Sequence, residues 1–379
     1  MKNHYDFISQ ELKDLIEPAA SVSHFFDSPL SFRVFKNAFI APYYEWNHSI
    51  GCVLDKDGVA VKDSECIEWK ENAEFYELDT AKREHKRVIY LGFLLTGFGH
   101  SYTDDLRKFW FLETEEYKSL AAQGYELVYT TSWNRPLPQG NWEVFRLADI
   151  DISDSRHITE LTQFDEVIIP DNSLRAMDYG RIYCNAYVEL LDRIKSKIPD
   201  PENSPSKVYF TRTRFTANSL KDYGEKEIER VFKDLGYTVI APEEYPVLQQ
   251  LQILRGCDSF AATDGSVAHL SLFAKPKTSV TIIVKANYLN FHQVMINELA
   301  DLDVTYVEAH HSSKANRSYP WWGPFYMCIN RYLEHYVGHP LLHLPYWMRF
   351  SYWEYFSGYQ LHRFYHWIRE VFFNLKNRF

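Results

Sequence analysis

The sequence predicts an α/β fold, and three observations within residues 207–285 support this prediction. First, short apolar runs recur along this stretch, at 208–210, 238–241, 259–263 and 280–284. Second, segments with apolar residues at helical spacing separate the runs. Third, Gly236 stands where a helix beginning at Glu225 needs its C-terminal glycine. Strands that alternate with helices of this length form right-handed βαβ units, which build a parallel sheet covered on both faces.

Charged and small residues follow these runs, at the edge where parallel sheets bind ligands. They are Arg212 and Arg214, the acid Glu243, and the turn Asp264, Gly265, Ser266 and Val267. The arginines offer cations, and the turn offers backbone N–H groups where the next helix begins. Glycine in that turn lets the backbone approach a ligand closely. These groups together suit a diphosphate, whose negative charge must be neutralised as it leaves.

Several of these residues also have an ordinary structural interpretation. Arg212 can be a surface arginine of a strand end. Glu227 can be a solvated helix residue, and the functional alternative is that it orients Arg212 or binds a ribose. Glu243 can cap its own loop, and the alternative is a contact to a ribose or a base.

A second polar group follows a buried strand that we predict at 87–93. Two glycines free the backbone there, and His100, Asp104 and Asp105 then precede a helix expected to begin near Leu106. Carboxylates at a helix start often only cap N–H groups, an effect of about 1 kcal/mol. A histidine with two acids on a glycine-loosened loop after a strand nevertheless suggests a functional site.

The rest of the chain divides at residues 199–206, where three prolines stand among polar residues as in a linker. We expect an N-terminal α/β lobe over 1–198, this linker, a Rossmann-like lobe over 207–320 and a tail over 321–379. Further elements are predicted as follows: helices within 1–20, at 178–198 and at 290–299, and strands at 126–129, 144–147, 166–170 and 304–307.

Composition narrows the class of protein. With 379 residues the chain is long enough for two domains, and its net charge of −10 argues against nucleic-acid binding. Five scattered cysteines without metal spacing predict reduced thiols and a cytoplasmic location. No run reaches the roughly 18 apolar residues that a membrane-spanning helix requires, and no signal peptide is apparent.

The tail differs from the rest of the chain in composition. Residues 321–379 hold 20 aromatic residues in 59 and carry a net charge of +3, which leaves −13 for the remainder. We expect helices around 324–336 and 346–376. The tail either packs across both lobes or forms an interfacial helix at the inner face of the plasma membrane, with aromatic residues at the headgroups. The two roles can coexist.

The stretch from FTRTRF through PEEYPVLQQLQILRG to DGSVAHLSLFAKP resembles glycosyltransferase family 61, in members that build bacterial capsules or exopolysaccharides. The positions that match the family pattern are Arg212, Glu225, Glu227, Gln252, Gly265, Leu272, Phe273 and Pro276. The upstream GHSYTDDLRKF is similar to the N-lobe signature of the family. One position departs: the family has histidine where this chain has Asp264, so the role of that histidine does not carry over. Asp264 then contacts a sugar hydroxyl or a backbone amide, or other groups bind the donor.

The resemblance implies a GT-B-like architecture of two Rossmann-like lobes, with a nucleotide-sugar donor, expected to be a UDP-sugar, on the C-terminal lobe. It implies inverting transfer to an acceptor on the N-terminal lobe, without metal or other cofactor. The acceptor would be a growing cell-surface glycan, such as capsule, exopolysaccharide or lipopolysaccharide, attached to a lipid. An inverting transfer needs one general base. We rank Asp105 and Asp104 ahead of His100, because one acid can orient the histidine.

Other interpretations remain open at this point. The replacement at Asp264 suggests a non-catalytic glycan- or nucleotide-binding relative as the alternative. A nucleotide-sugar epimerase is disfavoured, because no GxGxxG follows the first strand. The acidic patterns at 149–151 and 301–303 and the pair His310-His311 could suggest a metal, but such short patterns arise easily by chance.

Overall fold

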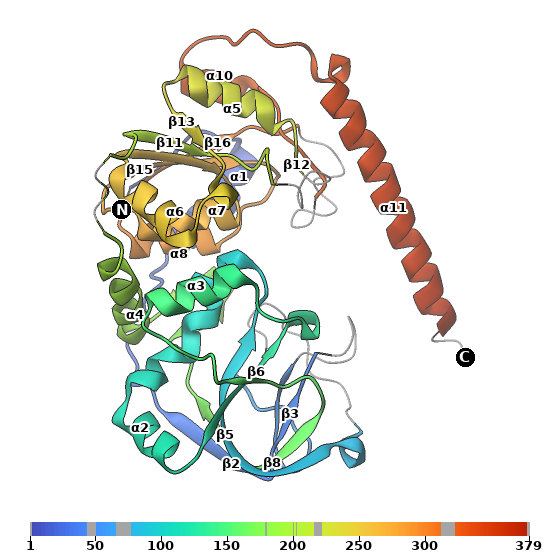
Figure 1. Ribbon diagram of the computed structural model, residues 1–379. Coiled ribbons are helices and arrows are strands. Elements are labelled where there is room, and N and C mark those ends of the chain that lie inside the picture. The colour runs from blue at the N-terminus through green and yellow to red at the C-terminus, as the bar shows by residue number, and fades with distance from the viewer. Residues whose placement is uncertain are drawn as a thin grey trace. The chain divides into compact units, whose positions relative to one another are not determined.

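The structure is a computed structural model that describes residues 2–43, 51–65, 77–178, 180–199, 201, 203–215, 222–311 and 323–376 (Figure 1). It divides into two compact units. The middle unit is Ser23–Pro199, and the C-terminal unit combines Met1–Val22 with Asp200–Phe379. The boundary at Pro199 and Asp200 lies inside the proline-rich stretch of the sequence.

Six strands of the C-terminal unit form one parallel sheet in the order β1-β16-β15-β14-β11-β13. Five of them are the strands expected from the apolar runs: β11 (Lys207–Phe210), β13 (Thr238–Ile240), β14 (Ser259–Thr263), β15 (Ser279–Val284) and β16 (Asp303–Glu308). The α/β class and the parallel sheet predicted for this stretch are therefore confirmed.

Helices cover both faces of this sheet, as Figure 1 shows. On one face, α5 (Glu225–Asp234) and α10 (Arg331–Val337) bury Ile228, Phe232 and Leu333 against the strands. The helices of the other face are α6 (Val247–Gly256), α7 (Ser266–His269) and α8 (His292–Leu299). Each lies between two strands in the sequence, so the crossovers bring the carboxyl ends of the strands to one edge of the sheet.

The beginning of the chain belongs to this same unit. β1 (Lys2–Phe7) pairs in parallel with β16 at the sheet edge, and α1 (Gln10–Ala20) follows with three buried apolar residues on one face. The sequence pattern predicted the helix but not the strand, and it assigned these residues to the N-terminal lobe. The strand escaped notice because its residues, KNHYDF, are mostly polar and only partly buried.

The middle unit is built on a mixed sheet. Its strands run β4-β3-β8-β5-β6-β7, with β2 also paired to β8. The pairs among β5, β6, β7 and β8 are parallel, whereas β2, β3 and β4 join in antiparallel fashion, so this sheet is not the all-parallel one of a Rossmann lobe. The bounds are β2 Phe32–Lys36, β3 Phe39–Ala41, β4 Cys52–Leu54, β5 Lys82–Leu94, β6 Glu126–Thr131, β7 Arg156–His157 and β8 Thr162–Pro170.

Two predictions for this unit were wrong. The segment expected as a strand at 144–147 is the end of α3 (Gln139–Leu147), since Asn141, Val144 and Phe145 recur at helical spacing and are buried. The helix expected at 178–198 begins only at Asn185 in α4 (Asn185–Ser196). Its first part is instead a hairpin of β9 (Leu174–Met177) and β10 (Gly180–Tyr183).

After β5 the chain turns through two 3₁₀ helices, Phe98–Tyr102 and Asp104–Glu113, and then α2 (Glu115–Ala122). The 3₁₀ segments hold the candidate residues His100, Asp104 and Asp105. The predicted helix near Leu106 is therefore present, but it is wound more tightly than an α-helix.

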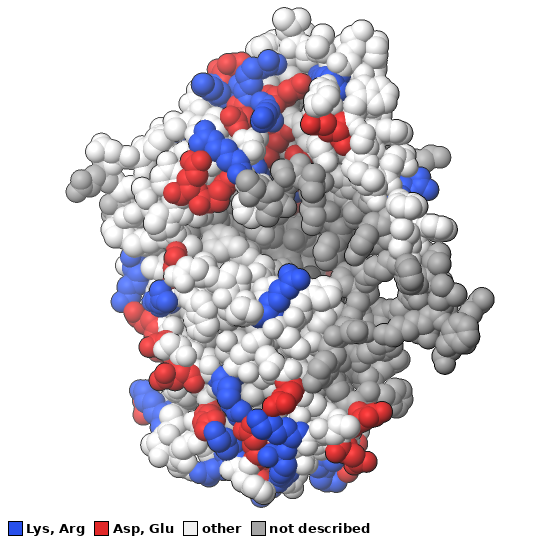
Figure 2. Space-filling model, turned by 45° about the vertical axis from the view of Figure 1, so that its right-hand side comes forward, with Lys and Arg blue, Asp and Glu red and all other residues white. Residues whose placement is uncertain are grey.

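The tail contains β17 (Phe325–Tyr326), α10 and one long helix, α11 (Phe350–Lys376), drawn in red in Figure 1. Two helical segments were expected here and both are present. Within the described residues, no helix combines the length and the apolar character needed to cross a bilayer. On the face drawn in Figure 2, basic and acidic residues lie in small intermingled groups, and neither sign dominates.

Candidate active site

Two cations and one carboxylate converge at the strand ends of the C-terminal unit. Arg212 follows β11, Lys285 follows β15, and Asp222 lies in the short strand β12 (Asp222–Tyr223). The Asp222 carboxylate is 3.6 Å from Arg212 Nη1 and 3.2 Å from Lys285 Nζ. All three side chains are largely buried, so their charges are poorly screened by solvent. Asp222 thus pairs with both cations, and the buried carboxyls of Glu225 and Asp264 also lie near them.

The buried carboxylate of Glu225 fixes the backbone at Arg212. Its Oε1 accepts hydrogen bonds from the Arg212 N–H at 2.9 Å and from the Tyr209 hydroxyl at 3.1 Å. Burial raises the pKa of Glu225 to about 7, although these two hydrogen bonds oppose the shift. The first residue of α5 thus holds the strand end from which the arginine projects.

The turn that follows β14 lies beside this arginine. Gly265 has φ 123° and ψ −162°, a conformation that side chains rarely adopt, and a Cβ built on it would lie 3.9 Å from Arg212 Nη1. The predicted proximity of Arg212 and the Gly265 turn is therefore present. Ser266 is exposed and Val267 half-buried at the start of α7.

Asp264 is buried at the end of β14. Its Oδ2 accepts from the Asn290 N–H at 3.2 Å, while Oδ1 has no hydrogen-bond partner within the described structure. Burial raises the pKa of this carboxyl to about 6, and the nearby Lys285 opposes the shift. Of the two contacts expected from the sequence, the one to a backbone amide is present.

The other residues expected near the donor lie in different surroundings. Arg214 is exposed and pairs with Glu244 at 3.0 Å. Glu227 forms an ion pair with Arg349 of the tail, so the carboxylate that orients Arg212 is Glu225 and not Glu227. The side chain of Glu243 is exposed, and Gln252 is half-buried in α6.

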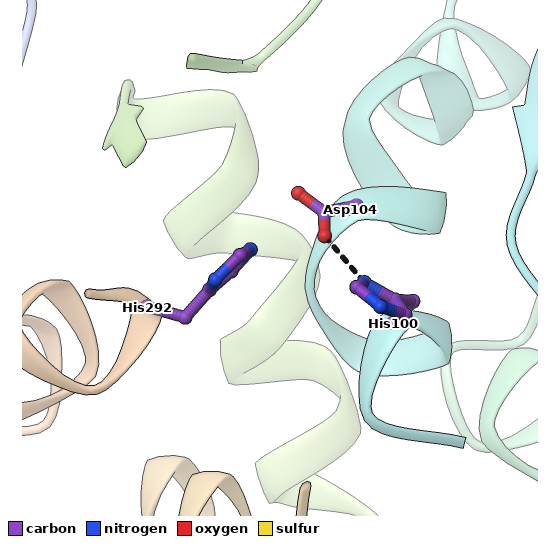
Figure 3. A group of neighbouring side chains, drawn as sticks. All are labelled: His100, Asp104 and His292. Atoms are coloured by element: carbon purple, nitrogen blue, oxygen red, sulfur yellow. Dashed lines mark hydrogen bonds and ion pairs between the residues drawn. The ribbon is translucent and has the colours of Figure 1, made fainter. Parts of the chain in front are cut away.

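In the middle unit, His100 and Asp104 form a hydrogen-bonded pair, which Figure 3 shows as a dashed line. His100 Nδ1 lies 2.7 Å from Asp104 Oδ2, and Arg181 of β10 donates from Nε to Asp104 Oδ1 at 2.7 Å. The Asp104 side chain has no exposed surface, whereas 30% of His100 is exposed. Asp104 therefore fixes the orientation of the imidazole through Nδ1. His292, also labelled in Figure 3, begins α8 of the C-terminal unit, where it bonds to Asn290.

Asp105 is completely buried beside this pair. Its Oδ1 accepts from the Leu95 N–H at 2.7 Å, and Asn141 Nδ2 lies 3.4 Å from its Oδ2. Burial raises the pKa of Asp105 to about 8. A protonated, inaccessible carboxyl is a poor base at neutral pH, so the geometry favours His100, in the reverse of the order expected from the sequence.

The acidic patterns that could have suggested a metal make ordinary contacts. Asp149 pairs with Lys197, Asp301 with Lys277 and Asp303 with His4. Of the two adjacent histidines, His310 is buried near Glu308 and His311 stacks on Tyr346.

Three residues of these sites were missed from the sequence. Lys285 stands directly after a predicted strand, as Arg212 does, so the same strand-end rule could have found it. Asp222 and Arg181 carry no such signal, because neither follows a strand predicted from the sequence, and Lys285 and Asp104, which they pair with, lie far away in the chain. Both become visible only when the chain has folded.

A comparison with protein families gives one match. The family model described as Glycosyltransferase 61 matches residues 98–281, a stretch that includes His100, Asp104, Arg212 and Gly265. No curated protein matches the chain. The α/β fold with its parallel sheet and this match together define the protein as an enzyme, a glycosyltransferase. The match over 98–281 supports family 61, as the sequence motifs had indicated.

Proposed function

We propose that this enzyme transfers a sugar, with inversion, from a nucleotide-diphosphate donor to a hydroxyl of a growing cell-surface glycan, in a GT-B-type arrangement. The observation that carries the proposal is the pair of cations, Arg212 and Lys285, held by Asp222 at the strand ends beside the Gly265 turn. The donor would be a UDP-sugar and the acceptor a lipid-linked chain of the capsule, exopolysaccharide or lipopolysaccharide kind. We propose a cytoplasmic location, supported by the buried free thiols of Cys52, Cys184, Cys257 and Cys328.

The C-terminal unit would bind the donor. A departing diphosphate gains negative charge as its bond to the sugar breaks, and fixed cations stabilise that charge in the transition state. Arg212 can contact two phosphate oxygens at once, whereas Lys285 acts as a point charge. In this proposal these two side chains and the backbone N–H groups of the turn provide the neutralisation without a divalent metal.

The middle unit would supply the general base. The acceptor oxygen forms its bond to the anomeric carbon while the bond from that carbon to the diphosphate breaks. The acceptor proton passes to the imidazole of His100. Asp104 fixes the imidazole through Nδ1 and stabilises the cation that forms, and Arg181 fixes Asp104 in turn.

Nucleotide binding tests the donor site. We expect Arg212→Gln and Lys285→Gln each to weaken UDP binding by about 10- to 100-fold, the loss of one charge-assisted hydrogen bond. The measurement is isothermal titration calorimetry with UDP, GDP and CDP. Arg214→Gln is the matched control, because Arg214 is two residues away but exposed and paired with Glu244. Equal losses in all three variants, or no nucleotide binding by the wild type, would contradict the proposal.

Turnover assays test the base. His100→Ala should lower kcat by about 10²- to 10⁴-fold with donor affinity unchanged, and Asp104→Asn should lower it less. Asp105→Asn should leave kcat near that of the wild type, and activity should persist in excess EDTA. If Asp105→Asn abolished turnover while His100→Ala retained it, Asp105 would be the base.

A further inference from the structure

The tail helix α11 has one face against the protein and another face exposed. Tyr352, Tyr355 and Tyr359 pack toward Tyr223, Tyr326 and Cys328 of the C-terminal unit. The residues turned outward are larger and more apolar: Trp353, Phe356, Leu361, Phe364 and Trp367. The face packed on the protein thus carries hydroxyl groups, whereas the exposed face carries indole and phenyl rings. A helix that is amphipathic only toward its own core has the reverse pattern, with apolar residues packed and polar residues exposed.

The segment before the helix extends this exposed surface. Its apolar residues with large exposure are Leu342, Leu344, Trp347, Met348 and Phe350. Leu342 is 97% exposed and Phe350 78%. We call residues 342–367 with these outward side chains the aromatic strip. A concentration of exposed large apolar side chains of this kind marks an interaction site.

Charge indicates what covers the strip. From Phe350 onward the sequence has four basic residues and two acids, Glu354 and Glu370, a net of +2, although the whole chain carries −10. Arg363 is exposed between Leu361 and Phe364. Tryptophan and basic residues side by side are typical of the boundary between lipid headgroups and acyl chains, where an indole is half in each phase and anionic lipid attracts the cations.

A second copy of the chain fits the strip less well. The positions of α11 that would form a coiled-coil seam with Phe350 and Trp353 include Ser357 and Gln360, followed by Phe364 and Trp367. Polar residues in the middle of the seam and bulky aromatic rings on either side of it do not match the Leu, Ile and Val of paired helices.

We propose that the aromatic strip lies flat on an anionic bilayer surface, with the helix in the plane of the headgroups. The described helices do not have the length and apolar character to span a bilayer, which agrees with a helix that lies on it. The inference rests on exposed side chains and charge, and it is independent of the sugar-transfer proposal.

Flotation of the full-length protein with vesicles tests the proposal. Vesicles of pure phosphatidylcholine are compared with vesicles containing phosphatidylglycerol. We expect binding to the anionic vesicles and weaker binding to the neutral ones, with the difference reduced by salt. The triple variant Trp353→Ser, Phe364→Ser, Trp367→Ser should lose binding by at least about tenfold, since each ring leaves an apolar phase.

The matched control is Val34→Ser with Val59→Ser, which removes exposed apolar residues of the middle unit and should leave vesicle binding unchanged. Equal circular-dichroism melts show that both variants fold. Quenching by brominated lipid should report tryptophan at headgroup depth, and the quenching should fall in the triple variant. Absence of vesicle binding by the folded wild type would overturn the proposal. So would a dimer in sedimentation that the triple variant abolishes, without any vesicle binding, because the partner would then be a second copy.

Discussion

Asp105 shows how burial decides what a carboxyl group can do. From the sequence it is one of three candidates for a base, ranked with Asp104 ahead of His100. In the fold it accepts from the Leu95 N–H and has no exposed surface, and its pKa is raised from 3.8 to about 8. The oxygen of the neighbouring Asn141 amide has no partner. Its Nδ2 donates to the Leu95 carbonyl at 3.1 Å, and this hydrogen bond fixes the orientation of the amide.

The pH dependence of stability follows from this pKa. Between pH 3.8 and about pH 8 the folded chain holds a proton on Asp105 that the unfolded chain has lost. The contribution of Asp105 to the free energy of unfolding is therefore complete at low pH. It declines as the pH rises through that window, by at most about 1.4 kcal/mol per pH unit. We expect Asp105→Asn to remove the decline, so that the stability lead of the wild type over the variant shrinks from pH 5 to pH 8.

Urea unfolding at pH 5, 6, 7 and 8 measures this difference. Asp151→Asn serves as the control, because Asp151 is exposed and its pKa is lowered by Ser153, so it produces no decline of this kind. Parallel stability profiles for the wild type and Asp105→Asn would show that Asp105 is ionised in the folded protein.

At the scale of elements, α5 links the donor site to the tail. Its first residue, Glu225, holds the backbone of Arg212, and Glu227, two residues further along, pairs with Arg349 just before α11. The helix begins after Gly224, which has φ +84° and packs against the backbone of β17 and the residue after it. A Cβ on Gly224 would lie 2.0 Å from the carbonyl oxygen of Met327. That backbone oxygen cannot rotate away as a side chain could.

Gly224→Ala should therefore destabilise the protein by about 3 kcal/mol or more, from the left-handed backbone and the clash together. It should also weaken nucleotide binding, because Glu225 shifts with the start of α5. Gly236→Ala is the matched control: Gly236 has φ +83° but nothing within 4 Å of its added Cβ. That variant should lose only about 1–2 kcal/mol and keep its UDP affinity. If Gly224→Ala and Gly236→Ala lost similar amounts of stability, the strain of the left-handed backbone alone would account for both losses. Denaturant melts and calorimetry give both quantities.

At the scale of the whole molecule, the chain leaves and re-enters its C-terminal unit. Residues 1–22 belong with 200–379, because β1 extends the parallel sheet and α1 buries Leu12 and Ile16. The Ser9 N–H also donates to Glu308 at 2.9 Å. A fragment that begins at the proline-rich stretch would therefore lack residues 1–22, which are part of the C-terminal unit.

We expect a fragment of 200–379 to be less stable than one in which residues 1–22 are joined to it by a flexible linker of about 12 residues. Each of the two buried apolar side chains of α1 contributes about 1.5–3 kcal/mol. Thermal melts by circular dichroism compare the two fragments, and a linked fragment with Leu12→Ser and Ile16→Ser is the control. Equal melting temperatures for all three would show that the N-terminal segment is dispensable.

The sequence by itself determined the βαβ order of residues 207–308, the position of Gly265 in the turn after a strand, and the enzyme class. These features are readable because apolar periodicity and turn chemistry are local: neighbours in the chain carry the signal. One rule, that ligands bind at the ends of parallel strands, identified Arg212, Gly265 and His100.

Only the tertiary structure decided which partners these residues take. Lys285 shares the Asp222 carboxylate with Arg212, although 73 residues separate the two cations in the chain. The choice of His100 over Asp105 depends on burial that packing creates. The polar strand β1 likewise pairs with a segment some 300 residues away. Charge pairing and desolvation act through space, so a pattern along one chain cannot encode them until the strands have brought the groups together.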